Sequence, residues 1–254
     1  MNDKFKHMKI ILTFAFLFQT ISMSSDFKTQ QLKYSRVREA YSEKQKGINE
    51  LLKSKNLKIT ELEVYLRAFK FGKKIQLWGK NKSDRKFKLI KEYKVCRKSG
   101  KLGPKREQGD LQVPEGFYHI DRFNPYSNFH LSLGINYPNT SDKILGVKGK
   151  LGGDIFIHGS CVTVGCLPIT DDQIKELYLF CLEARNNGQS TIPVTLFPAM
   201  LSDKNLDVIL KKYQGDTDKA NLWKELKLAY DLFNQTKELP SVRFLSDGSH
   251  KITP

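Results

Sequence analysis

Residues 155–166 read IFIHGSCVTVGC, a stretch that predicts a strand ending in a histidine, a short glycine-bearing loop and a cysteine. Cys166 stands just ahead of a predicted helix that Thr170 is expected to cap, and the positive end of a helix favours a thiolate. The imidazole of His158 can take the thiol proton and stabilise the resulting ion pair. Gly165 allows consecutive backbone N–H groups to point at a developing oxyanion. The stretch therefore predicts thiol acyl transfer, with Cys166 as the nucleophile and His158 as the base.

Two other kinds of site fit the same loop. One is a zinc site in which His158, Cys161 and Cys166 are joined by His119 or His130. The four-residue gap between these cysteines is at the long end of zinc spacing, and no second closely spaced cysteine pair exists, so this alternative is the weaker one. His119 and His130 fall in strand patterns, where an exposed or core-packed role is the simpler expectation. The other alternative is a structural disulfide, such as Cys161–Cys166, with His158 as a buried core residue.

The first 24 residues predict a secretory signal peptide. Lys4, Lys6 and Lys9 form a positive region, an apolar stretch follows over residues 10–21, and small residues then occupy the cleavage positions. A membrane anchor is the alternative, but a span needs about 20 apolar residues, so no stable span is expected in the mature form. The pattern predicts an exported protein of the periplasm or cell envelope.

The chain is strongly basic, with a formal net charge of +16 over 254 residues. Such a balance suits a polyanionic partner. Because the export pattern directs the protein out of the cytoplasm, anionic wall polymers are favoured and nucleic acid is not expected. The lysines are scattered rather than clustered, so much of the charge can serve solubility.

Apolar periodicity predicts an α+β fold, with a predominantly β catalytic domain and flanking helices. Three divisions follow for the mature chain: a helical N-terminal segment over residues 25–60, a catalytic domain over 61–200, and a helical C-terminal extension over 201–254. Strands are predicted at residues 62–68, 74–79, 87–95, 117–121, 129–135, 154–157 and 192–197; helices at 33–56, 170–185 and twice within 203–237; and a last strand or hairpin within 241–252.

Four cysteines allow three complete pairings and are few for a fold that depends on disulfides. Cys96 and Cys181 are expected to be buried small residues or to form a remote disulfide. At least one cysteine can equally be free and reactive.

Residues 158–166, HGSCVTVGC, resemble the catalytic signature of the YkuD-type L,D-transpeptidase family, in particular its YafK-like branch of murein L,D-transpeptidases. Other motifs resemble that branch in the same order, and the likeness covers roughly residues 60–200. These motifs are the strand pair ending at Trp78, SGKLGPK at 99–105, Gly109-Asp110, PEGFY at 114–118 and NYPN at 136–139.

The resemblance implies roles for five residues of the loop. Cys166 matches the nucleophile and His158 the general base, while Gly165 and the Cys166 amide match the oxyanion hole. Thr163 matches the Ser/Thr position two residues before that glycine, and Gly159 supports the loop after the histidine. No metal or organic cofactor is implied.

Two positions of the loop need separate treatment. Val164 stands where the common form of the motif has a second histidine, so no role of that histidine carries over to this chain. Cys161 fits the branch pattern and is interpreted as a loop-packing or oxidation-prone residue, with a second nucleophile as the alternative.

Weaker candidates lie upstream of the loop. Lys105 and Arg106 can pair with a substrate carboxylate, although a solvated loop charge is the equal alternative. Tyr118 and Tyr137 can line a peptide groove.

The resemblance implies peptidoglycan stem peptides as the substrate, cleaved through a thioester on Cys166. An amine acceptor gives transpeptidation, whereas water gives L,D-endopeptidase or amidase activity. A wall-binding or nucleic-acid-binding protein without catalysis is the alternative from another class. No particular oligomeric state is implied.

Overall fold

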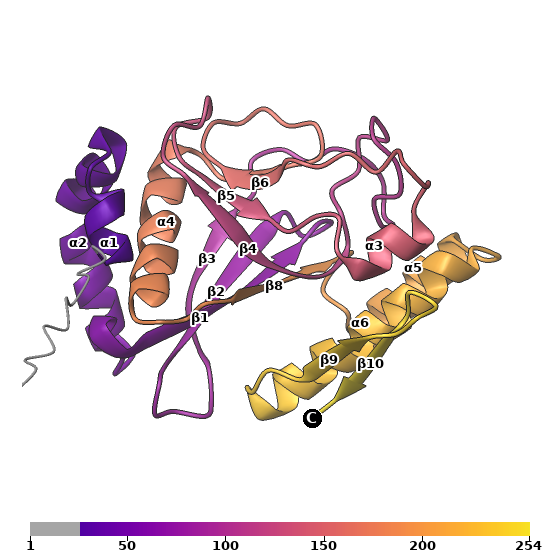
Figure 1. The fold of residues 1–254 in the computed structure, drawn as a ribbon. Coiled ribbons are helices and arrows are strands. Elements are labelled where there is room, and N and C mark those ends of the chain that lie inside the picture. The colour runs from indigo at the N-terminus through magenta and orange to yellow at the C-terminus, as the bar shows by residue number, and fades with distance from the viewer. Residues whose placement is uncertain (1–25) are drawn as a thin grey trace, which may run out of the picture.

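The computed structural model describes residues 26–254, so the predicted signal peptide, residues 1–24, lies outside the described residues. Within residues 26–254, no helix is both long enough and apolar enough to cross a membrane. Helices and a large curled sheet together confirm the predicted α+β class (Figure 1).

An eight-stranded sheet forms the centre of the molecule. Its strands are β1 (Leu62–Phe69), β2 (Lys74–Asn81), β3 (Lys88–Lys94), β4 (Gly116–Asn124), β5 (Ser132–Ile135), β6 (Ile155–His158), β7 (Leu167–Pro168) and β8 (Ile192–Phe197). Their order in space is β3-β2-β1-β8-β4-β5-β6-β7, and only the pairs β1/β8 and β6/β7 are parallel. The strands predicted at residues 62–68, 74–79 and 87–95 are confirmed, and they pair as an antiparallel β1–β2–β3 meander.

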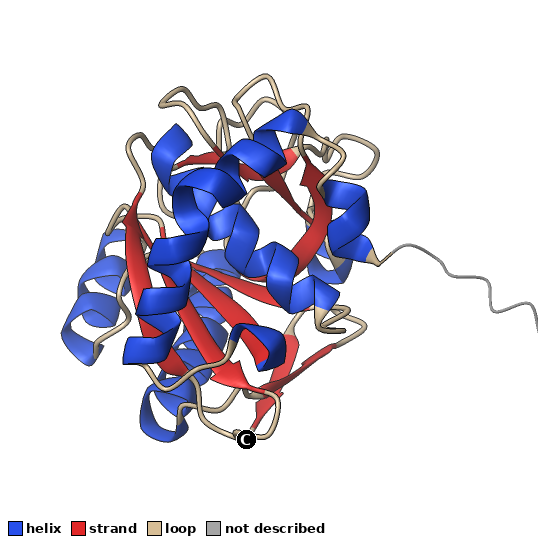
Figure 2. Ribbon diagram, turned by 90° about the vertical axis from the view of Figure 1, so that its left-hand side faces the viewer, coloured by secondary structure: helices blue, strands red, loops and turns tan. Residues whose placement is uncertain are grey.

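Helices cover both faces of this sheet (Figures 1 and 2). The helices are α1 (Phe27–Gln31), α2 (Ser35–Ser54), α3 (Thr140–Leu145), α4 (Asp171–Asn186), α5 (Asp203–Lys212) and α6 (Thr217–Thr236), with a 3-10 turn η1 (Ile59–Glu61). α4 packs on one face with α1 and α2 outside it, whereas α5, α6 and the hairpin of β9 (Ser241–Phe244) and β10 (His250–Thr253) lie on the other.

α4 is buried on nearly all sides because α2 covers the surface that turns away from the sheet. All side chains from residue 177 to 182 are fully buried. Thr170 caps the helix as predicted, since its side chain accepts a hydrogen bond from the Gln173 N–H. The cap fixes the start of α4 at Asp171, so that β7 lies between Cys166 and the helix.

The C-terminal segment shares a core with the sheet. Phe69 of β1 and Phe197 of β8 stack with ring centroids 5.3 Å apart and belong to the same apolar cluster as Trp223 and Leu226 of α6. Trp223 Nε1–H donates to Glu115 Oε2 at 2.7 Å, which satisfies the one polar atom of this buried ring. α6 is therefore anchored next to the loop that enters β4.

Four short elements are missing from the sequence prediction: α1, η1, α3 and β7. They span two to six residues, too few for an apolar period to stand out. α3 begins at a capping box formed by Asn139 and Asp142. The strand or hairpin predicted within residues 241–252 is confirmed as the β9–β10 hairpin, so the C-terminal extension is helical only in its first part.

Candidate active site

The candidate site lies at the end of β6 and in the loop that joins β6 to β7. His158 ends β6 and pairs with Pro168 of the parallel strand β7. Residues 159–166 connect the two strands and return Cys166 to the position just before β7. Cys166 lies at a bend directly before β7, and its thiol contacts the backbone of Asp154 and Phe156, at the start of the strand that ends in His158. The structure therefore brings both principal candidates to β6, His158 at its end and the Cys166 thiol against its backbone.

His158 is buried and held in one tautomer. Its ring packs against Phe129 with centroids 4.6 Å apart, and Nδ1 lies 2.5 Å from the Gly159 carbonyl oxygen. Because a carbonyl only accepts, Nδ1 carries the hydrogen and Nε2 keeps its lone pair. Among the described residues, none hydrogen-bonds His158 Nε2. Burial lowers the pKa of His158, partly offset by the bond to Gly159, so the imidazole is neutral at pH 7 and suited to accept a proton.

The Cys166 thiol rests against the backbone at the start of β6. Its Sγ lies 3.5 Å from the Asp154 carbonyl oxygen, and a hydrogen bond with the Phe156 backbone favours the thiolate. Burial nevertheless dominates and raises the pKa of the Cys166 thiol. The charge of Asp154 adds to this effect, and that of Lys105 opposes it. Before substrate binds, Cys166 is therefore a protonated thiol, which must lose its proton to act as a nucleophile.

The raised pKa of the Cys166 thiol disfavours a thiolate–imidazolium pair before substrate binds, and formation of that pair during turnover stays a prediction. α4 begins at Asp171 as predicted, and β7 lies between the helix and Cys166. No hydrogen bond joins Cys166 to His158 in the part of the chain that the structure describes. The resting pair is a neutral thiol and a neutral imidazole, and catalytic contacts of this kind commonly tighten only when substrate binds.

This neutral pair predicts the pH dependence of turnover. A base must be unprotonated, so activity is present above the pKa of His158 and is lost as the pH falls through that lowered value. In pH profiles of kcat/KM, we expect the acid limb below about pH 6.5, the ordinary histidine value. Ultraviolet absorbance of the free enzyme should show no thiolate at pH 7. Thiolate absorbance at pH 7, with an acid limb near pH 4, would instead reveal a resting ion pair.

The backbone N–H groups of Gly165 and Cys166, which the sequence predicts as oxyanion donors, both form hydrogen bonds in the turn before β7. Thr163 Oγ1 accepts the Cys166 N–H at 2.9 Å and donates to the Cys166 carbonyl oxygen at 2.7 Å. Gly165 has a φ of 95°, a conformation that favours glycine, and its N–H donates to Ser99 Oγ at 2.7 Å. Both amides are therefore occupied in the resting protein. Ser99, which sequence reasoning missed as a site residue, lies against the loop that carries the nucleophile.

Ser99 carries a prediction of its own. Its hydroxyl accepts from Gly165 and keeps one hydrogen free to donate, so it can extend the oxyanion hole. Ser99→Ala should lower kcat by about 100-fold, as loss of one oxyanion donor does, with little change in KM. Ser99→Thr, which keeps the hydroxyl, should retain most activity. A faster Ser99→Ala enzyme would mean that the hydroxyl only blocks the Gly165 amide.

Gly159 leaves no room for a side chain. A Cβ at this position would lie 2.6 Å from the Phe129 carbonyl oxygen and directly against Asp171 Oδ1. The same Asp171 oxygen accepts the Ser160 N–H at 2.7 Å, which ties the loop to the first residue of α4. This close packing explains why a glycine follows His158.

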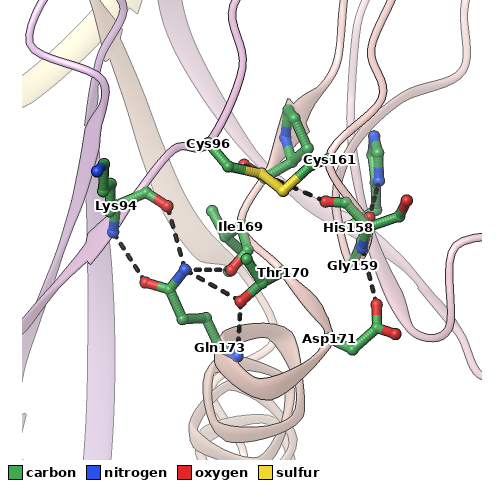
Figure 3. Close-up of a disulfide and its surroundings, with 11 residues drawn as sticks. Lys94, Cys96, His158, Gly159, Cys161, Ile169, Thr170, Asp171 and Gln173 are labelled. Carbon is green, nitrogen blue, oxygen red and sulfur yellow. Dashed lines mark hydrogen bonds between the residues drawn. A yellow bond between two sulfur atoms is a disulfide. The ribbon is translucent and has the colours of Figure 1, made fainter.

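A disulfide joins Cys96 to Cys161, with Cα atoms 5.7 Å apart (Figure 3). The alternative pairing of Cys161 with Cys166 is therefore wrong, whereas the remote disulfide expected as one possibility for Cys96 is confirmed. With its sulfur in the disulfide, Cys161 has no free thiol to act as a second nucleophile. Cys166 is free, and Cys181 is free and fully buried in α4. The bond links the segment after β3 to the catalytic loop above Gln173 (Figure 3).

Loss of the Cys96–Cys161 disulfide should make the catalytic loop less stable but should not abolish catalysis. Ser160 remains bound to Asp171 and Gly165 to Ser99, so Cys161→Ser should keep kcat/KM within about tenfold of wild type. Cys96→Ser should match it when both are assayed with reductant. A loss of several hundredfold in Cys161→Ser alone would assign Cys161 a direct role in catalysis.

The zinc alternative is not supported by the geometry. Cys161 has no thiolate to offer, because its sulfur is in the disulfide. Among residues 26–254, no group of three or more His, Cys, Asp or Glu side chains is arranged to hold a metal ion. His119 lies on β4, away from the catalytic loop in sheet order.

The four weaker candidates make contacts within the protein. Lys105 is buried and its Nζ donates to Asp110 Oδ1 at 2.6 Å, while Arg106 pairs with the carboxylates of two aspartates. The Tyr118 hydroxyl donates to Asp142 at 2.9 Å, and the Tyr137 hydroxyl donates to a backbone carbonyl. These contacts favour structural roles, and substrate binding by the four residues stays a prediction.

Comparison with known proteins points to one family. A family model described as the L,D-transpeptidase catalytic domain, YkuD, matches residues 73–195. The "Putative L,D-transpeptidase YafK" of Escherichia coli is 36% identical over 181 residues, which cover 70% of this chain and 70% of that protein.

Two solved structures show distant similarity. The helical cell shape determining protein Pgp2 from Campylobacter jejuni is 19% identical, covers 73% of each chain and superposes with a TM-score of 0.43. Bd1075 from Bdellovibrio bacteriovorus is 19% identical over 71% of this chain and 76% of its own, with a TM-score of 0.41.

Proposed function

The chain belongs to the L,D-transpeptidase family, and on that premise we propose that it is a cysteine acyltransferase acting on peptidoglycan stem peptides. Family membership supports a role connected with peptidoglycan. The further steps rest on the arrangement of Cys166, His158 and the Gly159 carbonyl. The proposal includes export to the periplasm or cell envelope, as the first 24 residues predict.

The reaction begins with the neutral pair. Cys166 Sγ attacks the carbonyl carbon of the scissile amide while His158 Nε2 takes the thiol proton. The Gly159 carbonyl holds Nδ1–H and stabilises the imidazolium that forms. The imidazolium then gives its proton to the leaving amine, the C–N bond breaks, and a thioester remains on Cys166. An amine acceptor converts the thioester to a new peptide bond, and water hydrolyses it.

One observation carries this proposal: the bond between Nδ1 and Gly159 leaves the lone pair of His158 Nε2 free, at the end of the strand whose backbone the Cys166 thiol contacts. His130 and His250 also leave Nε2 without a partner, so what distinguishes His158 is its place next to the loop that carries Cys166. The lowered pKa of His158 supports the same role, because it keeps the base unprotonated at neutral pH.

The proposal is tested by incubating the mature protein with defined muropeptides and analysing the products by mass spectrometry. We expect cross-linked products or stem peptides shortened at a bond between an L-centre and a D-centre, in EDTA as well as without it. Stem peptides that are bound but chemically unchanged would make the chain a wall-binding protein without catalysis. Activity lost in EDTA and restored by zinc would contradict the thiol mechanism.

A further inference from the structure

A basic depression of about 520 Å³ is lined in part by residues 98–102, the segment from which Ser99 binds the catalytic loop. Its walls come from the turn between β1 and β2, from residues 98–102, and from the end of α5. Phe71 and Tyr213 supply apolar surface, and no acidic side chain lines the depression. We call it the lysine pocket, after Lys98, Lys101 and Lys212 on its walls.

The three lysines carry positive charge that nothing in the protein neutralises. In the described chain, none of them forms an ion pair or donates a side-chain hydrogen bond, and all three are exposed. The Lys98 ammonium lies 4.8 Å from the ring centre of Phe71, whose side chain is 63% exposed. Ammonium groups above apolar walls suit an anionic group on a carbon skeleton, such as the carboxylate of an amino-acid side chain.

A fourth lysine at the pocket, Lys70, differs from these three because its ammonium group is bound within the protein. Lys70, at the buried side of the pocket, donates to Glu115, Gln112 and the Gly103 carbonyl oxygen. Its hydrogen-bonding capacity is used within the protein. The charge available to a ligand is therefore that of the three lysines on the walls.

The segment that forms one wall of the pocket is joined to the catalytic loop at two points. Ser99, between Lys98 and Gly100, accepts the Gly165 N–H at 2.7 Å, and Cys96 is bonded to Cys161. Because Ser99 contacts the residue before Cys166 and its neighbours Lys98 and Gly100 line the pocket, we expect an extended peptide, at about 3.4 Å per residue, to reach from Cys166 to the pocket within a few residues. A group bound there would also fix the segment that holds the Gly165 amide.

We propose that the lysine pocket binds a carboxylate of the peptide substrate within a few residues of the scissile bond. This inference rests on the proposed function, because the peptide is its ligand. Binding of the carboxylate places the scissile carbonyl at Cys166 and sets the preference for acidic over amidated stem peptides.

The test compares two stem peptides that differ only in whether this carboxylate is free or amidated. Wild type should prefer the free acid by about 30-fold in kcat/KM, the scale of a charge-assisted contact. The triple variant Lys98→Gln, Lys101→Gln, Lys212→Gln should lose this preference through slower turnover of the acid alone.

A matched control removes the same charge elsewhere. Lys46, Lys86 and Lys224 are exposed and form no ion pair, so Lys46→Gln, Lys86→Gln, Lys224→Gln should keep the full preference. Equal losses in the two triple variants would reduce the effect to overall charge and overturn the proposal. So would a pocket variant that still prefers the acid.

The two proposals can fail separately. If wild type turns over neither peptide, the proposed function fails, and titration calorimetry with the same peptides still tests the pocket. Tighter binding of the acid that depends on the pocket lysines supports the carboxylate site, and equal binding of both peptides overturns it. Binding of inorganic phosphate that depends on these lysines, without any preference between the peptides, would assign the pocket to a phosphate polymer and overturn the carboxylate proposal.

Discussion

Cys166→Ala should abolish turnover of stem peptides, with kcat/KM falling on the order of 10⁴-fold or more, because the variant has no atom that can form the thioester. The fold should survive. Cys166 Sγ makes only backbone contacts among the described residues, with the Asp154 carbonyl at 3.5 Å and with Phe156, and its removal leaves a small space at the edge of the sheet. Steady-state kinetics, circular dichroism and thermal melting measure the two effects.

Cys181 provides the matched control for Cys166. Its thiol is fully buried in α4, so Cys181→Ala should cost about 1–2 kcal/mol of unfolding free energy as a cavity mutation. Its activity at 25 °C should remain at the wild-type level. Cys166→Ala should thus lose activity but not stability, whereas Cys181→Ala should lose stability but not activity. Near-normal turnover by Cys166→Ala would refute the mechanism.

A carbapenem-type β-lactam, which family resemblance suggests as a thiol acylating agent, gives a direct readout. Peptide mapping should place the adduct on Cys166 in wild type and in Cys161→Ser. An adduct on Cys161 would reverse the assignment of the nucleophile.

His158→Gln should lower kcat/KM by about 10²–10⁴-fold, the usual contribution of a positioned base. Because the Cys166 thiol has a raised pKa, hydroxide must then generate the thiolate directly. Activity of the variant should therefore rise tenfold per pH unit through the neutral range, where wild type has reached its plateau. A glutamine amide can still donate to the Gly159 carbonyl, so the loop should keep its shape.

His119 serves as the control for this substitution. It lies on β4 and pairs with Pro193 of β8, outside the catalytic loop. His119→Gln should leave both the rate and the pH profile unchanged. If His158→Gln shows the wild-type acid limb, another group is the base.

Much of the fold could be predicted from local sequence. Alternating apolar residues over 62–79 are sufficient for the first two strands, because one face of a half-buried strand must be apolar. Thr170 followed by two aspartates predicts the start of α4, since the cap and the helix dipole act within one turn. The left-handed conformation of Gly165 follows from the turn that the loop needs.

The rest depends on contacts between distant residues. The Ser99–Gly165 bond and the Cys96–Cys161 disulfide span more than sixty residues each, and four cysteines leave three pairings open. Burial decides whether Cys166 is a thiol or a thiolate, and chain order does not report burial. The sequence therefore locates the candidate nucleophile and the candidate base but not their protonation states.

The disulfide has a consequence for the survival of the Cys166 thiol under oxidising conditions. Cys161 and Cys166 lie in one short loop, where a free Cys161 could capture the nucleophile as an inactive intraloop cystine. Pairing with Cys96 removes that partner and leaves Cys166 reduced. Under air, Cys96→Ser should thus lose activity that dithiothreitol restores, whereas Cys161→Ser should not. The Cys96–Cys161 disulfide therefore protects the Cys166 thiol from oxidation by its neighbour Cys161.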